Sequence, residues 1–188
     1  MFSSKNFFAG LMIVATFIAI GCSESTSPLP EDFIIRRVDS GIVVNYSANK
    51  NEILKGYKDV TPFIDSLFPV PNEFMEKGKD TLVMALFGSH DNDINIYMDR
   101  EKVKESMREK GYRPANAYEL FYYAKLPLTG KIKSDRDIMI IAALGTKKSN
   151  INQETNPGAA IFDLDSTRSL TDIYLLGGRD YVLGVAIK

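Results

Sequence analysis

The feature that most constrains this chain is an apolar run near its N-terminus, residues 7–20, interrupted only by Gly10 and Thr16. The run is 14 residues long, whereas a helix that spans a bilayer needs about 20. A short run of this kind after one positive charge, Lys5, is typical of a secretory signal peptide. Gly21 and Cys22 follow at once, so the sequence predicts cleavage between them.

The four residues Ala19-Ile-Gly-Cys22 resemble the lipobox of bacterial lipoproteins, in which Leu is more usual where this chain has Ala19. The resemblance implies that diacylglycerol is attached to the Cys22 sulfur and that the new N-terminus is acylated. Two or three acyl chains make release from a membrane rare, because each buried methylene contributes about 0.8 kcal/mol. The alternative is an uncleaved signal anchor with an incidental cysteine, and the shortness of the run disfavours it.

Ser23 resembles the residue that directs lipoproteins to the outer membrane of bacteria with two membranes. The expected location is therefore the cell envelope, and the outer membrane if the source has two membranes. Residues 22–32 are polar and contain Pro28 and Pro30, which is typical of a linker. About ten such residues reach at most ~35 Å. The chain is thus divided into a signal peptide, 1–21, a lipidated tether, 22–32, and one globular domain, 33–188.

The composition of the mature chain excludes several classes of function. After removal of 21 residues it carries 22 basic and 24 acidic side chains, a balance that opposes nucleic-acid binding and a polybasic membrane contact. Cys22 is the only cysteine and His90 the only histidine. Neither a disulfide nor a zinc site of Cys and His ligands can form within one chain.

The domain is predicted to be α+β, a mostly antiparallel sheet with two or three short helices. A turn at 39–41 separates two strands, Gly177-Gly178 reads as a hairpin loop between the last two, and residues 147–158 look like a long loop. The predicted strands are 33–38, 42–46, 81–87, 138–144, 159–164, 172–176 and 181–187. We expect the strand at 81–87 to be buried on both faces.

Three helices are predicted, over 51–57, 100–110 and 117–125. The second places Val103 and Met107 on one face, with Gly111 as its C-terminal stop. The third begins with a capping box, in which Asn116 caps the helix and Glu119 stands three residues on.

Three short blocks occur in this part of the chain: Arg113-Pro-Ala-Asn116 with Glu119-Leu120, then Ala143-Leu-Gly-Thr146, then the closing residues 183–188. Together they resemble a family of short uncharacterised bacterial proteins with Arg-Pro-Ala-x-x-x-Glu-Leu and Ala-Leu-Gly-Ser/Thr blocks. Members of that family often carry a Trp in the C-terminal half, and this chain has none. The resemblance implies no activity and assigns no functional residue.

Two acidic patterns suggest metal chemistry. Asp163 and Asp165, in Ile-Phe-Asp-Leu-Asp-Ser-Thr, resemble the first motif of haloacid-dehalogenase-type phosphatases, in which one Asp attacks phosphorus beside Mg²⁺. That chemistry needs a nucleotide-fold body after the motif, and only 21 residues follow Thr167. A strand that ends in an acidic turn is favoured.

Asp91, Asp93 and Asn95 have the spacing that starts a calcium loop, but Ile96 and Lys102 stand where such a loop needs Gly and Glu. A looser surface calcium site and an ordinary polar loop remain as alternatives. His90, between Ser89 and Asp91, does not form a hydrolytic triad, because adjacent residues on an extended segment point to opposite faces.

Tyr118 and Tyr122 lie one turn apart on the third helix, on the side away from its apolar stripe. They could form an exposed aromatic patch that docks a protein or a glycan. Burial under a second layer of the domain is favoured, because aromatic stripes are usually core.

The sequence thus predicts a membrane-anchored lipoprotein that presents a non-catalytic binding or interaction domain, with no cofactor and no metal. The alternative is a divalent-metal-dependent envelope hydrolase, phosphatase-like, that uses Asp163 and Asp165. The expected partners are the membrane, through the lipid on Cys22, and a protein or glycan of the envelope, but no nucleic acid.

Overall fold

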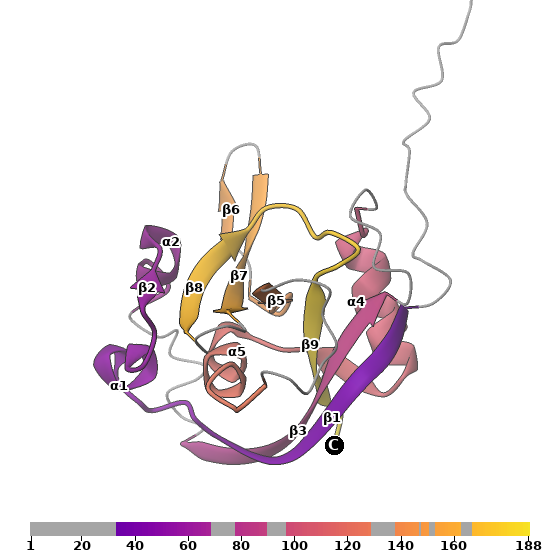
Figure 1. Ribbon diagram of the computed structural model, residues 1–188. Coiled ribbons are helices and arrows are strands. Elements are labelled where there is room, and N and C mark those ends of the chain that lie inside the picture. The colour runs from indigo at the N-terminus through magenta and orange to yellow at the C-terminus, as the bar shows by residue number, and fades with distance from the viewer. Residues whose placement is uncertain are drawn as a thin grey trace, which may run out of the picture.

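The computed structural model describes residues 33–68, 78–89, 97–128, 138–146, 148–150, 153–162 and 167–188 (Figure 1). The described residues form one domain of four helices and a mostly antiparallel sheet, so the predicted α+β class is confirmed. The strands are β1 (Phe33–Asn45), β2 (Asp59–Val60), β3 (Lys79–Ser89), β4 (Tyr112–Pro114), β5 (Ile138–Ala142), β6 (Lys148–Asn150), β7 (Gln153–Phe162), β8 (Arg168–Ile173) and β9 (Tyr181–Ala186). The helices are α1 (Lys50–Leu54), α2 (Pro62–Asp65), α4 (Arg100–Glu109) and α5 (Ala117–Tyr123).

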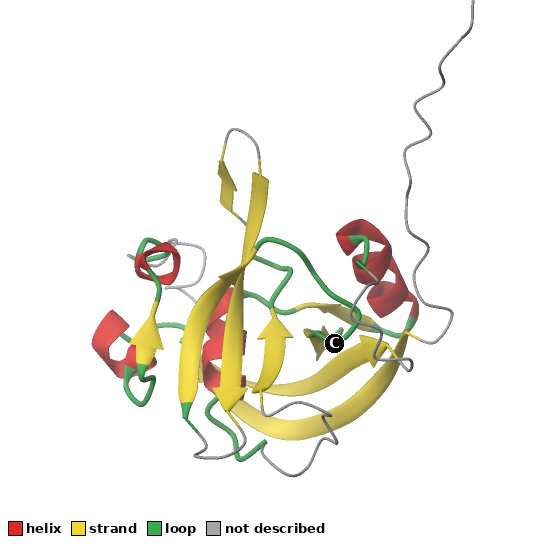
Figure 2. Ribbon diagram, turned by 45° about the horizontal axis from the view of Figure 1, so that its top comes forward, coloured by secondary structure: helices red, strands yellow, loops and turns green. Residues whose placement is uncertain are grey.

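The sheet is mostly antiparallel and follows the order β1-β3-β9-β5-β7-β8-β2, with β4 joined to β9 and β6 joined to β7. Among the strands that the structure describes, only the pairs β5–β9 and β2–β8 are parallel. The sheet curves strongly, and α5 lies inside the curve while α4 lies on the outer side (Figures 1 and 2). The fold is therefore one sheet with a helix against each face.

Side chains of the central strands alternate between these two helical layers. On β3, Met84 and Leu86 belong to the inner core around α5, whereas Ala85 and Phe87 belong to the outer core beneath α4. This period of two explains why β3 is apolar along most of its length. The prediction of burial on both faces is right from Met84 onward, but Val83 is 39% exposed.

The predicted turn at 39–41 is wrong, because β1 runs through it as one strand. Its pairing with β3 continues on both sides, with a register shift between Asp39 and Ile42. Gly41 has a φ of 75° and accommodates the extra residue of this bulge without the steric cost of a Cβ atom. The same residue types that favour a turn also favour a bulge, and pairing with β3 decides between them.

The Gly177-Gly178 hairpin is also wrong. β8 pairs with β7 and β2, whereas β9 pairs with β3, β4 and β5, so the two strands on either side of these glycines are not partners.

Residues 147–158 likewise do not form a long loop. They contain β6 and the first half of β7, which pair with each other, and Thr155 and Asn156 are buried. The polarity of these residues predicted an exposed loop. The first half of β7 is instead covered because it also pairs with β8.

The two longer helices agree with the sequence predictions to within one or two residues. Val103 and Met107 of α4 are fully buried, and Gly111 takes the left-handed conformation after its end, with a φ of 81°. Asn116 and Glu119 form the predicted capping box of α5. Local signals were sufficient for these helices because caps and stripes involve neighbours within four residues.

Candidate functional site

The inner helix α5 is the most deeply buried helix of the described chain, since six of its seven residues are buried. A helix leaves unpaired N–H groups at one end and unpaired C=O groups at the other. Inside a protein these groups need partners, because water is absent. The polar side chains that gather around the two ends of α5 are therefore the first candidates for a functional site.

Glu119 is fully buried at the N-terminal end of α5. Its Oε1 accepts hydrogen bonds from the Tyr46 hydroxyl at 2.6 Å and from Arg113 Nη2 at 2.6 Å. Its Oε2 accepts from the backbone N–H of Asn116 at 2.7 Å and from Arg113 Nη1 at 2.9 Å. A carboxylate accepts about four hydrogen bonds. The acceptor capacity of Glu119 is thus filled, and none remains for a metal or a substrate.

The two side chains that donate to Glu119 each keep one protonation state. The hydrogen bond to Glu119 is the main cause that raises the pKa of the Arg113 guanidinium above its ordinary value. Burial, and then the hydrogen bond to Glu119, raise the pKa of the Tyr46 phenol. Arg113 stays charged and Tyr46 stays neutral at ordinary pH. Neither group is tuned to transfer a proton near neutrality.

The three blocks noted in the sequence meet at this same end of α5. The Gly145 N–H donates to Ala115 O at 2.8 Å, and the Ala117 N–H donates to Thr146 Oγ1 at 3.0 Å. The Ala115 N–H donates to Leu183 O of β9 at 2.9 Å. A Cβ atom on Gly145 would lie 2.7 Å from Ala115 O, so only glycine permits this approach. Each block therefore has a structural role in placing α5.

The C-terminal end of α5 is held by two residues that the sequence interpretation missed. Arg168 of β8 donates from Nε to Ala124 O at 2.7 Å and from Nη2 to Leu126 O at 3.1 Å. The Tyr57 hydroxyl donates to Phe121 O at 2.6 Å. A cation at a helix C-terminus is favourable because the carbonyl dipoles point toward it. No local pattern could reveal these contacts, which join residues more than 40 positions apart.

A third polar contact joins α5 to β1. Arg37 binds Asp39 through Nε at 2.6 Å and Nη2 at 2.7 Å, and the Tyr123 hydroxyl donates to Asp39 Oδ2 at 2.7 Å. Burial is the main cause that raises the pKa of Tyr123, followed by its hydrogen bond to Asp39. Asp39 lies at the bulge of β1, so the bulge directs this carboxylate toward the end of the helix.

Tyr118 does not form the exposed patch that one interpretation of the sequence required. Its side chain is 3% exposed, and its ring lies 6.3 Å from the Tyr46 ring and 6.1 Å from the Phe68 ring. Burial raises the pKa of Tyr118 to about 12. Tyr122 is half-buried, and Lys125 Nζ lies 5.6 Å from the centre of its ring. Tyr118 is thus core, as the favoured alternative predicted, and a docking site centred on it is excluded in this fold.

The remaining predicted site residues lie outside the described residues: Gly21, Cys22, His90, Asp91, Asp93, Asn95, Asp163 and Asp165. The strand before the two aspartates of the phosphatase-like motif is described. It is β7, and it is antiparallel to both β5 and β8. A nucleotide-binding α/β body has parallel strands at this place. The described strands on the two sides of the motif, β7 and β8, are thus antiparallel neighbours.

Nothing in the described ranges points to a metal centre. No group of three or more His, Cys, Asp or Glu side chains there could hold a metal ion. The buried charged side chains of the same ranges are Lys104, Glu119 and Asp180, and each has a partner. The partner of Asp180 is the N–H of Gly177, and that of Lys104 is Glu101.

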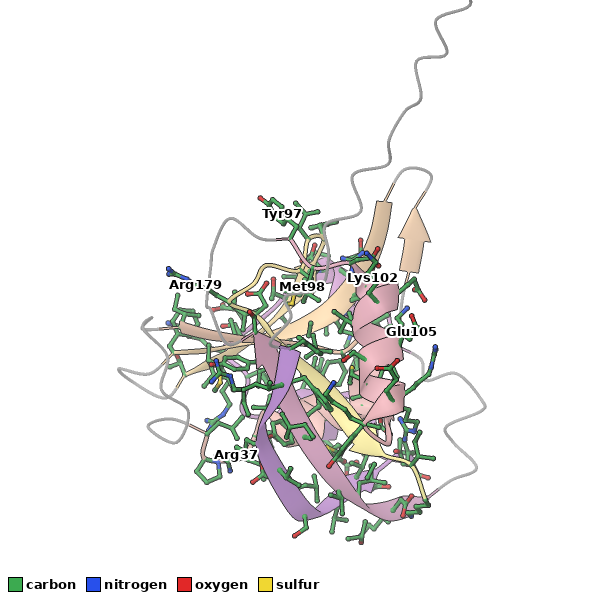
Figure 3. The ribbon with its side chains drawn as sticks, turned by 90° about the vertical axis from the view of Figure 1, so that its right-hand side faces the viewer. Arg37, Tyr97, Met98, Lys102, Glu105 and Arg179 are labelled. Atoms are coloured by element: carbon green, nitrogen blue, oxygen red, sulfur yellow. The ribbon has the colours of Figure 1, made fainter. Side chains whose placement is uncertain are left out.

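Among the large apolar side chains that are exposed in the described residues, two sets come from segments that pair with each other. The first is the valine group, Val38, Val43 and Val83, on β1 and β3. The second consists of Tyr97, Tyr174 and Leu175, and we refer to it as the Tyr97 patch. Its two segments are joined by a bridge between Tyr97 and Gly177 and by a hydrogen bond of 2.8 Å from the Met98 N–H to Leu176 O. Figure 3 shows Tyr97 beyond the N-terminal end of α4, pointing away from the sheet.

Comparison with known proteins adds no family to this description. No protein family, no curated protein and no solved structure matches the chain. In the ranges that the structure describes, no helix is both long enough and apolar enough to cross a membrane.

Proposed function

We propose that this protein is a lipid-anchored envelope protein whose domain serves as a non-catalytic binding or interaction module. The anchor is the acylated Cys22, and residues 22–32 are the tether. The observation that carries the second half of the proposal is the state of Glu119. The most buried carboxylate of the described chain has all its acceptor positions filled by donors that fix α5.

The other polar contacts around α5 support the same interpretation. Arg168 and Tyr57 donate hydrogen bonds to carbonyl oxygens at the end of α5. Asp39 accepts hydrogen bonds from Arg37 and Tyr123. A catalytic site needs a group that can accept or donate a proton, or attack, from a position open to substrate. These groups stabilise the fold instead, and the exposed apolar groups are left as the features suited to binding.

Mass spectrometry of the protein purified from membranes tests the anchor. We expect a chain that begins at Cys22 and carries the added mass of two or three acyl chains. Cys22→Ser removes the acylated sulfur, so this variant should be released from the membrane fraction. An intact initiator methionine, or an unmodified sulfur on a cleaved chain, would contradict the proposal.

The hydrolase alternative is tested on the same preparation. Phosphatase activity is measured with a chromogenic monoester, with and without Mg²⁺, for the natural sequence and for Asp163→Asn and Asp165→Asn. We expect no Mg²⁺-dependent activity in any of them. Activity that needs Mg²⁺ and is lost in both variants would establish the enzyme and reject a non-catalytic module.

A further inference from the structure

We propose that the Tyr97 patch rests on the surface of the membrane that holds the lipid anchor. This inference deepens the proposed function and rests on its acylated Cys22. It assigns a lipid surface, rather than a protein, as the occupant of the patch. The valine group serves as the internal comparison, because it is also apolar and exposed.

The patch is prominent and well supported. Tyr97, Tyr174 and Leu175 are 55%, 46% and 61% exposed. The two segments that carry these side chains are joined by the backbone bridge between Tyr97 and Gly177 and by the hydrogen bond from the Met98 N–H to Leu176 O. Arg100, at the start of α4, also donates to the carbonyl oxygen of Ile173 at 3.0 Å and to that of Tyr174. A patch on such a braced support keeps its side chains in place, so little ordering entropy is lost on contact.

The place where the tether joins the domain favours the membrane as occupant. Phe33 is the first residue of β1, and it belongs to the same outer core as Met98 and Leu176. Met98 and Leu176 are the chain neighbours of Tyr97 and Leu175. The tether therefore enters the domain at the core that underlies the patch.

The length of the tether limits which faces can reach the bilayer. The ten residues between Cys22 and Phe33 reach at most ~35 Å. A domain of this size has a radius of gyration of about 15 Å and is roughly 40 Å across. The tether is thus no longer than the domain is wide. A surface near Phe33 can contact the bilayer while the tether is only partly extended. A surface on the far side of the domain can contact the bilayer only if the tether is almost fully extended.

The chemistry of the patch suits the boundary between headgroups and acyl chains. Tyrosine is enriched at that boundary because its ring is apolar while its hydroxyl remains hydrated. Leu175 adds an exposed aliphatic side chain to the two tyrosines. Basic and acidic side chains are mixed in the segments that carry the patch, so we expect no preference for anionic lipids. They are Arg100, Lys102 and Arg179 against Asp99, Glu101 and Asp172.

Tethering makes so small a patch sufficient. Three side chains give weak affinity to a free protein, but the anchor turns the contact into an intramolecular event at high effective concentration. The role of the patch is then to set the orientation of the domain. The face of the domain that contacts the membrane is then the one at the N-terminal end of α4. The other faces remain accessible to binding partners.

The test uses the absence of tryptophan from the chain. Leu175→Trp and Val43→Trp each introduce a single fluorophore into the acylated protein, which is reconstituted into vesicles of phosphatidylcholine with brominated acyl chains. We expect Trp at 175 to be quenched at least two-fold more than Trp at 43, and its emission to shift to shorter wavelength. Equal quenching at the two positions would overturn the inference.

A second variant separates the natural patch from the insertion tendency of tryptophan itself. Quenching of the tryptophan fluorescence is measured for Tyr174→Trp alone and for Tyr174→Trp combined with Tyr97→Ser and Leu175→Ser. We expect the two serines to reduce quenching at least two-fold, and unchanged quenching would overturn the inference. The intact mass of each sample reports acylation independently. If the protein is acylated but the fluorophore in the patch is not quenched, the membrane contact is rejected while the proposed lipid anchor stands. Binding of a soluble protein by this unquenched patch would reject the membrane contact in the same way. An unacylated chain rejects the proposed function.

Discussion

The two helices that pack on opposite faces of the sheet are stabilised in different ways. The outer helix α4 is ten residues long and buries three of them, and its polar side-chain contacts are mostly local. Asp99 caps its first turn, and Lys104 pairs with Glu101 at 2.7 Å. The inner helix α5 buries six of seven residues and receives side chains from β1, β4 and β8.

This difference teaches where polar interactions matter in this fold. Around α4, water can replace a lost partner, so each ion pair contributes little. Around α5, a lost partner leaves a buried donor or acceptor without compensation. We therefore expect the stability of the domain to depend on the inner polar contacts, and we rank four measurements by expected effect.

Glu119→Ala should have the largest effect. It removes the capping box and leaves the buried Tyr46 hydroxyl and one edge of Arg113 without their acceptor. Breaking a buried ion pair costs about 3–5 kcal/mol, and we expect about 3 because the Arg113 side chain is 43% exposed. The free energy of unfolding is measured in urea, with the exposed Glu105→Ala of α4 as control, which should change it by less than about 0.5 kcal/mol. Equal effects of the two variants would mean that the inner contacts are not decisive.

Gly145→Ala should be next. The added methyl meets backbone atoms, Ala115 O at 2.7 Å and Pro114 O at 2.9 Å, which cannot move without shifting α5. Overpacking of this kind costs about 1–3 kcal/mol. Gly177→Ala is the matched control, because its Cβ would first meet Asp180 Oδ2 at an ordinary 3.4 Å. Thermal unfolding of both variants checks this, and a Gly145→Ala protein as stable as the control would show that the contact is adjustable.

Alkaline pH should destabilise the inner layer. Burial raises the pKa of Tyr46, Tyr57 and Tyr123 above the ordinary value of about 10, so the unfolded chain loses these protons first. Their contribution is complete below about pH 10 and falls as the pH rises above it. Urea unfolding between pH 8 and 11 measures the slope. Tyr57→Phe should make the slope shallower, and an unchanged slope would mean that this phenol does not remain neutral in the folded state.

Lys104→Met should have the smallest effect. The substitution keeps the buried apolar stem of residue 104 and removes the ion pair with Glu101, whose side chain is 71% exposed. Because the Glu101 carboxylate remains hydrated, we expect the pair to contribute about 0.5 kcal/mol, as exposed helix pairs of this spacing do. Urea unfolding at low and high salt checks the value. A loss above 1 kcal/mol would remove the distinction between the two helices.

Features that depend on neighbours a few residues apart could be predicted. The capping box of α5, the glycine stop after α4 and the position of Val103 and Met107 all follow from contacts within about four positions. The burial of Tyr118 was favoured for a similar reason, since an aromatic residue in a short helix usually packs inward. The predicted class and the mostly antiparallel sheet are confirmed.

Features that depend on which strands meet could not be predicted. The residues at 39–41 suited both a turn and a bulge, and the glycines at 177 and 178 suited both a hairpin and a wider connection. Arg168 and Tyr57 gave no signal at all, because their partners on α5 lie 44 and 64 positions away. Glu119 was identified as a cap, but its ion pair with Arg113 and its bond to Tyr46 were not.

The sequence by itself determined the local elements of this protein: where its two longer helices begin and which of their faces are apolar. The tertiary structure alone decided the strand order, the continuity of β1 and the meeting of three separate blocks at one end of α5. The reason is physical. A cap or a stripe is stabilised by nearby residues and is therefore written locally, whereas strand pairing depends on the total burial that one arrangement achieves over all others.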